Sequence, residues 1–167
     1  MNEDDLVIDP WGSAQSTDYD RIISQFGLAS MEGVSVPSPS KLHRRGIVFA
    51  HRDVDQVLEA QRTGSPFGVL TGLMPSGQMH LGHSMVVEQV KWFQQHGGDV
   101  TIAVADLESQ ATRGISLEKG RKVALEEYVA HYAALGLEPD KTEVYFQSTR
   151  PDVQRLGFQL GLSLIHI

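Results

Sequence analysis

The sequence predicts an α/β fold organised around a parallel β-sheet. Three apolar runs of strand length, at residues 67–71, 100–105 and 142–146, alternate with segments whose apolar side chains repeat at helical spacing. The connections between them are short, which favours right-handed strand–helix–strand crossovers and hence a parallel sheet. Ligands of such sheets bind beyond the carboxyl ends of the strands. The segments after residues 71 and 105 are therefore the expected site.

The part before the sheet, residues 1–65, is expected to be an extension of short helices and irregular segments. A first helix begins at Asp18, carries apolar residues at helical spacing to Phe26 and ends at Gly27. Residues 36–40, VPSPS, predict a linker. A second helix follows residues 51–53, and its inward side chains are expected to be Val54, Val57 and Leu58.

Residues 66–161 are expected to form the first part of the sheet domain. The first strand leads into residues 71–84, TGLMPSGQMHLGHS, and a long helix then runs to His96 and stops at two glycines. The second strand is continuously apolar, which predicts cover on both of its faces, and it ends at Asp106. Further helices open at Ser116 and near Pro151. Their expected inward side chains are Ala124, Leu125, Tyr128, Tyr132 and Leu135 in the first, and Val153, Leu156 and Leu160 in the second.

The end of the sequence departs from this pattern. Residues 162–167, LSLIHI, continue the last helix without a capping residue, and three strands alone leave an open sheet edge. We therefore expect the chain to be a fragment, with residues 162–167 a candidate for non-native sequence.

Composition excludes several classes of function. The 167 residues carry a formal net charge of −7, which argues against a broad nucleic-acid-binding surface. There is no cysteine, so disulfide scaffolds and thiolate metal sites are excluded. No signal peptide precedes the first acidic residues, and no apolar run approaches the roughly 20 residues of a membrane span. We expect a cytoplasmic protein with no membrane partner.

Two histidines mark the turn after the first strand. His80 and His83 lie three residues apart, on one face of the first turn of the expected helix. Backbone N–H groups lack partners there and the helix dipole is positive, so an anion is favoured. Gly72, Gly77 and Gly82 leave room for a phosphate or a flat ring near the backbone. The pattern favours a nucleotide triphosphate.

Three hypotheses account for the two imidazoles. A zinc pair is disfavoured because helical zinc pairs stand at i, i+4 and no third ligand is evident, so we predict no metal site. In the second hypothesis the rings only cap backbone groups. The third, which we favour, is hydrogen-bond donation to oxygens that gain charge while an α-phosphate is attacked, with the substrate supplying the nucleophile.

Several motifs resemble one enzyme family. Pro75-Ser76-Gly77 followed by Met79-His80-Leu81-Gly82-His83 resembles the HIGH signature of class I aminoacyl-tRNA synthetases, in the branch of the tyrosine and tryptophan enzymes. The N-terminal part resembles, in order and spacing, tryptophanyl-tRNA synthetases of the archaeal and eukaryotic type. This resemblance rests on Asp9-Pro10-Trp11, Asp18-Tyr19-Asp20, Phe26-Gly27, Arg44-Arg45-Gly46 and His51-Arg52-Asp53, and it spans about Ile8 to Gly161.

The resemblance implies a Rossmann-like catalytic domain of the class I synthetase type, incomplete here and without the anticodon-binding domain. It implies ATP-dependent activation of L-tryptophan with Mg²⁺, transfer to tRNA(Trp), and a homodimer. His80 and His83 would be the catalytic ligands of the triphosphate. The residues it assigns to ATP are Thr71, Gly72, Pro75, Ser76, Gly77, Met79 and Gly82. Those it assigns to the amino-acid side are Leu70, Ala103, Asp106, Glu108 and Gln110.

The amino-acid half departs from the family pattern. Leu70 and Ala103 stand where the eukaryotic enzymes have a tyrosine and a glutamine, and residues 105–109 resemble the version in the tyrosyl enzymes. Tyr145 and Gln147 are further candidates for the missing donors. No lysine lies in a setting like KMSKS, the family's second signature, so we expect the chain alone not to complete the reaction. Three alternatives stay open: a tyrosine–tRNA ligase, a nucleotidyltransferase outside the synthetases with the same H-x-G-H element, and a synthetase-derived binding module.

Overall fold

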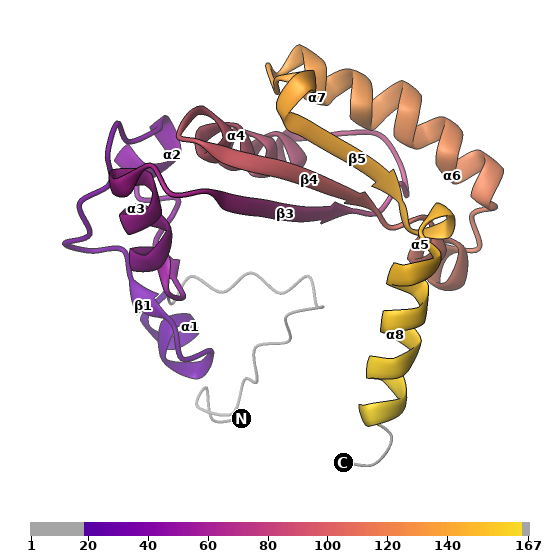
Figure 1. Cartoon of the computed structure of the whole chain (residues 1–167), viewed down its shortest axis with the longest axis horizontal. Coiled ribbons are helices and arrows are strands. Elements are labelled where there is room, and N and C mark those ends of the chain that lie inside the picture. Colours follow the sequence, from indigo (N-terminus) through magenta and orange to yellow (C-terminus); the bar gives the residue numbers. More distant parts are fainter. Residues whose placement is uncertain (1–18, 165–167) are drawn as a thin grey trace, which may run out of the picture. The chain divides into compact units, whose positions relative to one another are not determined.

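The computed structural model describes residues 19–164, and the side chains of residues 19–161. The chain divides into two compact units between Glu59 and Ala60, which lie inside a helix (Figure 1). The predicted motif Asp9-Pro10-Trp11, the predicted helix start at Asp18 and residues 165–167 lie outside the described residues.

The N-terminal unit contains short elements. They are α1 (Tyr19–Gln25), β1 (Ala29–Ser30), α2 (Lys41–Arg44), β2 (Ala50–His51) and the start of α3 (Val54–Thr63), with β1 and β2 paired antiparallel. The helix α2 was missed by the sequence analysis. It begins because the Ser40 side chain accepts hydrogen bonds from the backbone N–H groups of Leu42 and His43.

The residues of the His51-Arg52-Asp53 motif connect parts of this unit. His51 Nδ1 accepts a hydrogen bond from the Val54 N–H at 3.2 Å, at the start of α3. The Arg52 guanidinium donates to the Phe26 carbonyl oxygen at 2.6 Å, just beyond α1. These motif residues therefore have structural partners within their own unit.

The second unit is the predicted parallel α/β arrangement. Its sheet has the order β3-β4-β5, and all three strands run in parallel. The strands are β3 (Phe67–Leu73), β4 (Gly98–Val104) and β5 (Thr142–Phe146). The helices are α4 (Leu81–Gln95), α5 (Asp106–Arg113), α6 (Leu117–Val123), a π-helical segment (Ala124–Val129), α7 (Ala130–Ala134) and α8 (Pro151–Leu164). Figure 1 shows α5 and the start of α8 at the carboxyl ends of the strands.

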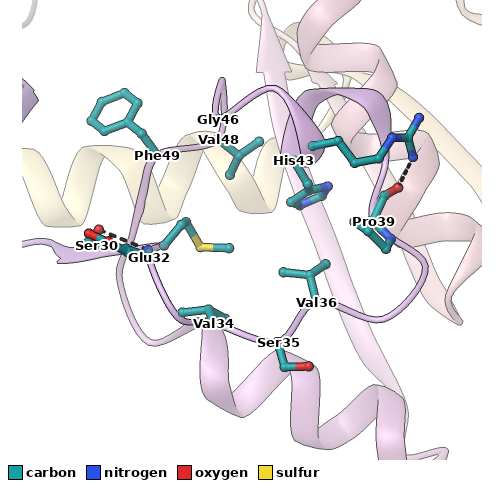
Figure 2. A pocket seen from close by; sticks show the side chains of 12 residues that line it. Ser30, Glu32, Val34, Ser35, Val36, Pro39, His43, Gly46, Val48 and Phe49 are labelled. Carbon is teal, nitrogen blue, oxygen red and sulfur yellow. Dashed lines mark hydrogen bonds between the residues drawn. The ribbon is translucent and has the colours of Figure 1, made fainter.

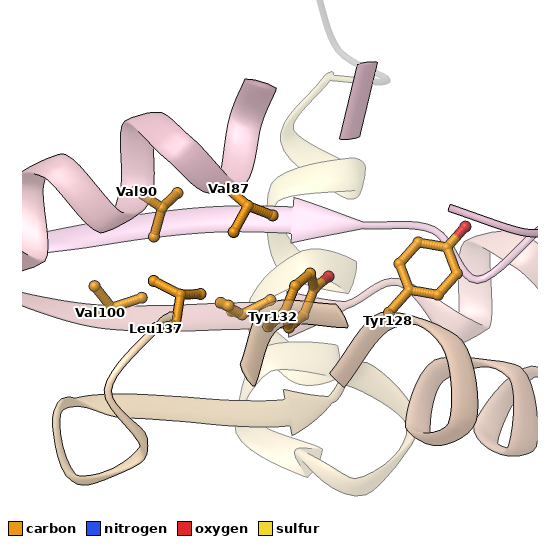
Figure 3. Packing of buried hydrophobic residues seen from close by; sticks show 7 residues of the cluster. Val87, Val90, Val100, Tyr128, Tyr132 and Leu137 are labelled. Carbon is orange, nitrogen blue, oxygen red and sulfur yellow. The ribbon is translucent and has the colours of Figure 1, made fainter. Parts of the chain in front are cut away.

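One face of this sheet holds the hydrophobic core. Val87 and Val90 of α4 pack with Val100 of β4, with Tyr128 of the π-helical segment and with Tyr132 of α7 (Figure 3). Both crossovers step in the same direction along the sheet, so right-handed connections place their helices on the same side. The core is therefore a single layer between the helices and the sheet.

The other face of the sheet is open within this unit. Gly68, Leu70 and Gly72 of β3 are exposed and alternate with half-buried residues. On β4, Asp99 is exposed and Thr101 is half-buried. Ala103 on the same face is nevertheless buried. The prediction that the second strand is covered on both faces therefore holds toward the carboxyl end of β4 and fails toward its amino end.

Two of the residues predicted to be buried in the helical segment after Ser116 are exposed. Ala124, Tyr128 and Tyr132 are buried as expected, but Leu125 and Leu135 are 46% and 36% exposed. The buried residues repeat every four positions, which in an α-helix would rotate by about 40° at each step. The wider π-helical turn at 124–129 removes part of that rotation. The two leucines, placed by α-helical periodicity, therefore face solvent.

The prediction that α8 buries an apolar stripe is also wrong. Val153, Leu156 and Leu160 are 37%, 56% and 58% exposed. Figure 1 shows that α8 leaves the carboxyl ends of the strands and extends away from the sheet. Its side chains consequently do not reach the core described above.

Candidate functional site

The two histidines lie at the start of α4 and bind backbone groups. His80 is the N-cap residue and His83 is the third residue of the helix. Nδ1 of His80 accepts a hydrogen bond from the Gly82 N–H at 3.2 Å, and Nδ1 of His83 accepts one from the His80 N–H at 3.3 Å. The ring centroids are 4.0 Å apart. The capping role considered as the second hypothesis is thus present in the structure.

Capping uses only one nitrogen of each ring. Because Nδ1 accepts an N–H, the neutral imidazole carries its proton on Nε2. Burial, and then the nearby His80, lower the pKa of His83 below its usual value, so its neutral form is favoured. Each histidine therefore retains an Nε2–H donor at a helix N-terminus, and this arrangement suits a phosphate oxygen.

The loop before α4 is anchored from the inside. Pro75 is buried, and its carbonyl oxygen accepts a hydrogen bond from the Ser109 hydroxyl at 3.3 Å. Ser109 itself is fully buried in α5. The Thr112 hydroxyl lies 3.7 Å from the Met74 sulfur, one residue before Pro75 in the loop. The helix α5 thus fixes the loop that leads to the histidines.

The predicted ATP residues divide into exposed and anchoring groups. Ser76, Gly77 and Gly82 are exposed around the helix start. The Pro75 ring is buried, and Met79 packs against the hydrophobic core, so these two side chains help to hold the loop in place. Thr71 lies in β3, as the strand predicted at residues 67–71 requires, and Gly72, expected in the loop after that strand, also belongs to β3.

Three residues of the predicted amino-acid side share the open face of the sheet. Gly72 pairs with Ala103, and Ala103 pairs with Tyr145 on β5. Leu70, two residues before Gly72, lies on the same face and is 73% exposed. A Cβ added at Gly72 would lie 3.7 Å from the Ala103 carbonyl oxygen, an ordinary van der Waals contact. The Tyr145 ring is covered by the Arg150 guanidinium at 4.6 Å.

Asp106 is buried and its carboxylate accepts hydrogen bonds from neighbouring residues. It is 2% exposed, and its Oδ1 accepts hydrogen bonds from the N–H groups of Leu107 and Ser148 at 3.0 Å each. Its Oδ2 accepts one from the Ser148 hydroxyl. Both carboxylate oxygens thus join the end of β4 to the turn after β5. These bonds give Asp106 a structural role, and its predicted contact with the amino acid stays a prediction.

Glu108 and Gln110 are exposed on α5. They are two residues apart, which corresponds to about 200° around the helix axis. The helix therefore directs the two side chains to different sides, and the structure does not bring them together as one predicted group.

Three contributing residues were not recognised from the sequence as part of the site. Ser109 and Ser148 lie in polar segments, where hydrophobic periodicity gives no signal. Tyr128 was predicted to be buried, but not to contact a histidine. Its ring packs edge-on against His83, with the centroids 5.5 Å apart and the planes at 80°.

The described residues contain one further feature of interest. A hollow of about 600 Å³ lies within the N-terminal unit, and Met31, Val34, Val36, Val48 and Phe49 supply most of its apolar lining (Figure 2). Within residues 19–164, no group of three or more histidine, aspartate or glutamate side chains is arranged to hold a metal ion. None of the helices in that range is long and apolar enough to cross a membrane.

Comparison with known proteins connects this geometry to a family. The sequence profile of the family described as tRNA synthetases class I (W and Y) matches residues 62–162. The chain is 44% identical over 159 residues to a tryptophan–tRNA ligase of Methanosarcina acetivorans, covering 94% of this chain and 36% of the relative. It is 48% identical over 155 residues to the tryptophan–tRNA ligase of Thermoplasma acidophilum, covering 93% and 35%.

The fold agrees with these sequence matches. The crystal structure of tryptophanyl-tRNA synthetase from Aeropyrum pernix superposes with a TM-score of 0.74 at 45% identity, covering 86% of this chain and 41% of that one. Tryptophanyl-tRNA synthetase from Trypanosoma brucei gives a TM-score of 0.69 at 30% identity, covering 79% and 43%. The chain spans about a third of the length of the curated relatives named here.

Proposed function

This chain belongs to the class I tRNA synthetase family that contains the W and Y enzymes, and from that membership we propose that it supplies the ATP-binding half of a tryptophan–tRNA ligase. The observation that carries the proposal is the pair of histidines at the start of α4, whose Nδ1 atoms accept backbone N–H groups and thereby leave the proton on Nε2 to donate to a ligand. The named relatives support tryptophan as the amino acid.

The site suits charge stabilisation without proton transfer. The carboxylate of the amino acid would attack the α-phosphorus of ATP, forming the aminoacyl adenylate as the bond to pyrophosphate breaks. His80 and His83 would donate from Nε2 to phosphate oxygens whose charge increases, and the helix N-terminus would add its positive dipole. Their Nδ1 atoms are occupied by backbone N–H groups, so neither ring serves as a base through that nitrogen.

The donors at this site fit the phosphates and not a metal ion, because N–H groups cannot ligate a cation. Mg²⁺, which the family implies, would be held through phosphate oxygens. The amino-acid side chain would lie near the open face formed by Leu70, Ala103 and Tyr145. Transfer to tRNA(Trp), a homodimer and a cytoplasmic location belong to the same proposal and follow from the family.

A chimaeric enzyme tests the proposal. Residues 19–161 would replace the matching part of the Aeropyrum pernix enzyme, and ATP–pyrophosphate exchange would be measured with tryptophan and with tyrosine. We expect exchange that depends on tryptophan, and a loss of about 10²–10³-fold when His83 is replaced by alanine. The unmodified Aeropyrum enzyme is the control. Exchange that depends on tyrosine would identify the alternative ligase, and exchange that is unaffected by the replacement of His83 would contradict the proposed site.

A further inference from the structure

A buried aromatic residue contacts the histidine pair from a different helix. Tyr128 is 2% exposed and packs in the core with Val87, Val90 and Tyr132. Its ring also meets His83 edge-on, at 5.5 Å between centroids. Since His83 in turn packs on His80 at 4.0 Å, the three rings form a continuous row from the core to the helix start.

The backbone around Tyr128 is unusual. Residues 124–129 form a π-helical turn between α6 and α7. Such turns are rare, occur mostly as single insertions in α-helices and are frequent at functional sites. This turn keeps Ala124, Tyr128 and Tyr132 on one buried line, as described above. It thereby directs the Tyr128 ring toward the start of α4.

The capping bond alone defines the His83 ring poorly. The distance from the His80 N–H to His83 Nδ1 is 3.3 Å, slightly beyond the usual range for such bonds. The second side-chain torsion of histidine is also broad, with two roughly equivalent orientations. An edge-on aromatic neighbour restricts that rotation, because such pairs prefer this geometry. The ionisable side chains seen against the ring are His80 and Tyr128.

We propose that Tyr128 is a positioning residue for His83, which holds the imidazole so that Nδ1 accepts the His80 N–H and Nε2–H faces a ligand. The assignment of a triphosphate as the ligand of Nε2–H rests on the proposed function. The orientation of the His83 ring does not depend on it. Because Tyr128 is only 2% exposed, we assign it no contact with the ligand.

Nuclear magnetic resonance of the 167-residue chain with ¹⁵N-labelled histidine tests this inference without a turnover assay. Imidazole ¹⁵N shifts report the tautomer of His83, and a pH titration reports its pKa. Three variants are compared with the wild type: Tyr128→Phe retains the ring, Tyr128→Leu removes it, and Tyr132→Leu removes an equally buried ring of the same cluster.

We expect a single Nε2–H tautomer and a pKa below 6.5 for His83 in the wild type, and the same result in Tyr128→Phe and Tyr132→Leu. Tyr128→Leu should give a mixture of tautomers and a pKa shifted back toward 6.5, because the ring regains solvent and rotation. An unchanged His83 in Tyr128→Leu, or an equal change in Tyr132→Leu, would overturn the inference.

A measurement on the wild type covers the case in which the leucine variants do not fold. Nuclear Overhauser contacts between the rings of Tyr128 and His83 should be present, and their absence would overturn the inference on its own. Mg·ATP is then added to the same sample. A fixed His83 ring whose Nε2 does not respond to the nucleotide would contradict the proposed function and leave the positioning role intact.

Discussion

The variant Gly82→Ala should weaken triphosphate binding at the start of α4 while leaving the stability of the chain nearly unchanged. A Cβ added to Gly82 would lie 3.0 Å from Cε1 and 3.1 Å from Nδ1 of His80. These distances are shorter than ordinary contacts, so the ring of His80 must move by a few tenths of an ångström. This shift would lengthen and weaken the 3.2 Å bond that the ring accepts from the residue 82 N–H.

Two opposing effects act on the folded state of Gly82→Ala. Alanine favours a helix over glycine by about 0.8–1 kcal/mol, whereas loss of an N-cap acceptor costs about 0.5–2 kcal/mol. The free energy of unfolding should therefore change by no more than about 1 kcal/mol. In ligand binding, no gain offsets the displaced ring. A misplaced donor to a charged phosphate loses about 1.5–3 kcal/mol of binding free energy, which raises the Kd about 10- to 100-fold.

The assay is titration of the chain with Mg·ATP, combined with urea unfolding. Gly157→Ala is the matched control, because Gly157 lies inside α8 and an added Cβ meets nothing within 4 Å. It should gain about 0.8–1 kcal/mol of stability and keep the wild-type Kd for Mg·ATP. A Gly82→Ala variant that binds Mg·ATP as tightly as the wild type would refute the reasoning.

Three further predictions concern the parts that support the site. Ser109→Ala removes the donor to the Pro75 carbonyl and should destabilise the chain by about 1–3 kcal/mol in urea unfolding; unchanged stability would show that α5 does not anchor the loop. Asp106→Ala should cost about 1.5–3 kcal/mol in the same assay. Asp106→Asn should cost less, since its amide can accept from the Ser148 N–H and donate to the Ser148 hydroxyl, and equal losses would contradict this bonding pattern. Because the pKa of His83 is lowered on folding, the unfolded chain binds more protons below about pH 6.5 and stability falls as the pH drops through that value. Urea midpoints at about pH 7.5 and 5.5 should therefore differ more for the wild type than for His83→Gln, and equal differences would exclude this contribution.

The sequence predicted the sheet well because its strands are simple apolar runs. Residues 142–146 were placed without error, and the other two strands differ from the prediction by one or two residues at their ends. The helix start at Ser116 was also found, because the serine hydroxyl caps the N–H of Lys119. Sequence patterns therefore predicted the strands and this helix start, whose structure is determined by nearby residues.

The elements and contacts that the sequence analysis did not predict have identifiable physical causes. The helix α5 is polar, and Asp106 and Ser109 are the residues it buries, so hydrophobic periodicity could not detect it. The π-helical turn violates the period of 3.6 residues on which the placement of Leu125 and Leu135 relied. The bonds between Asp106 and Ser148 could not be predicted, because Ser148 lies 42 residues further along the chain.

The chain also shows that a histidine cap alone does not identify a site. His43 lies at the third position of α2, and its Nδ1 is 3.2 Å from the N–H of Ser40, much as His83 is bonded to His80. That helix has only four residues and follows a proline-rich segment. The histidines of α4 differ because they follow a strand of a parallel sheet and an anchored glycine-containing loop. Position in the fold, more than the cap itself, supports their assignment.

The most direct test of the central claim is a Mg·ATP titration of the chain labelled with ¹⁵N in its histidines. The account predicts that the Nε2 resonances of His80 and His83 shift on binding, while their Nδ1 atoms keep the signature of acceptors from the backbone. A titration in which Mg·ATP binds but neither Nε2 responds, or in which a ring releases its backbone bond and binds through Nδ1, would contradict it.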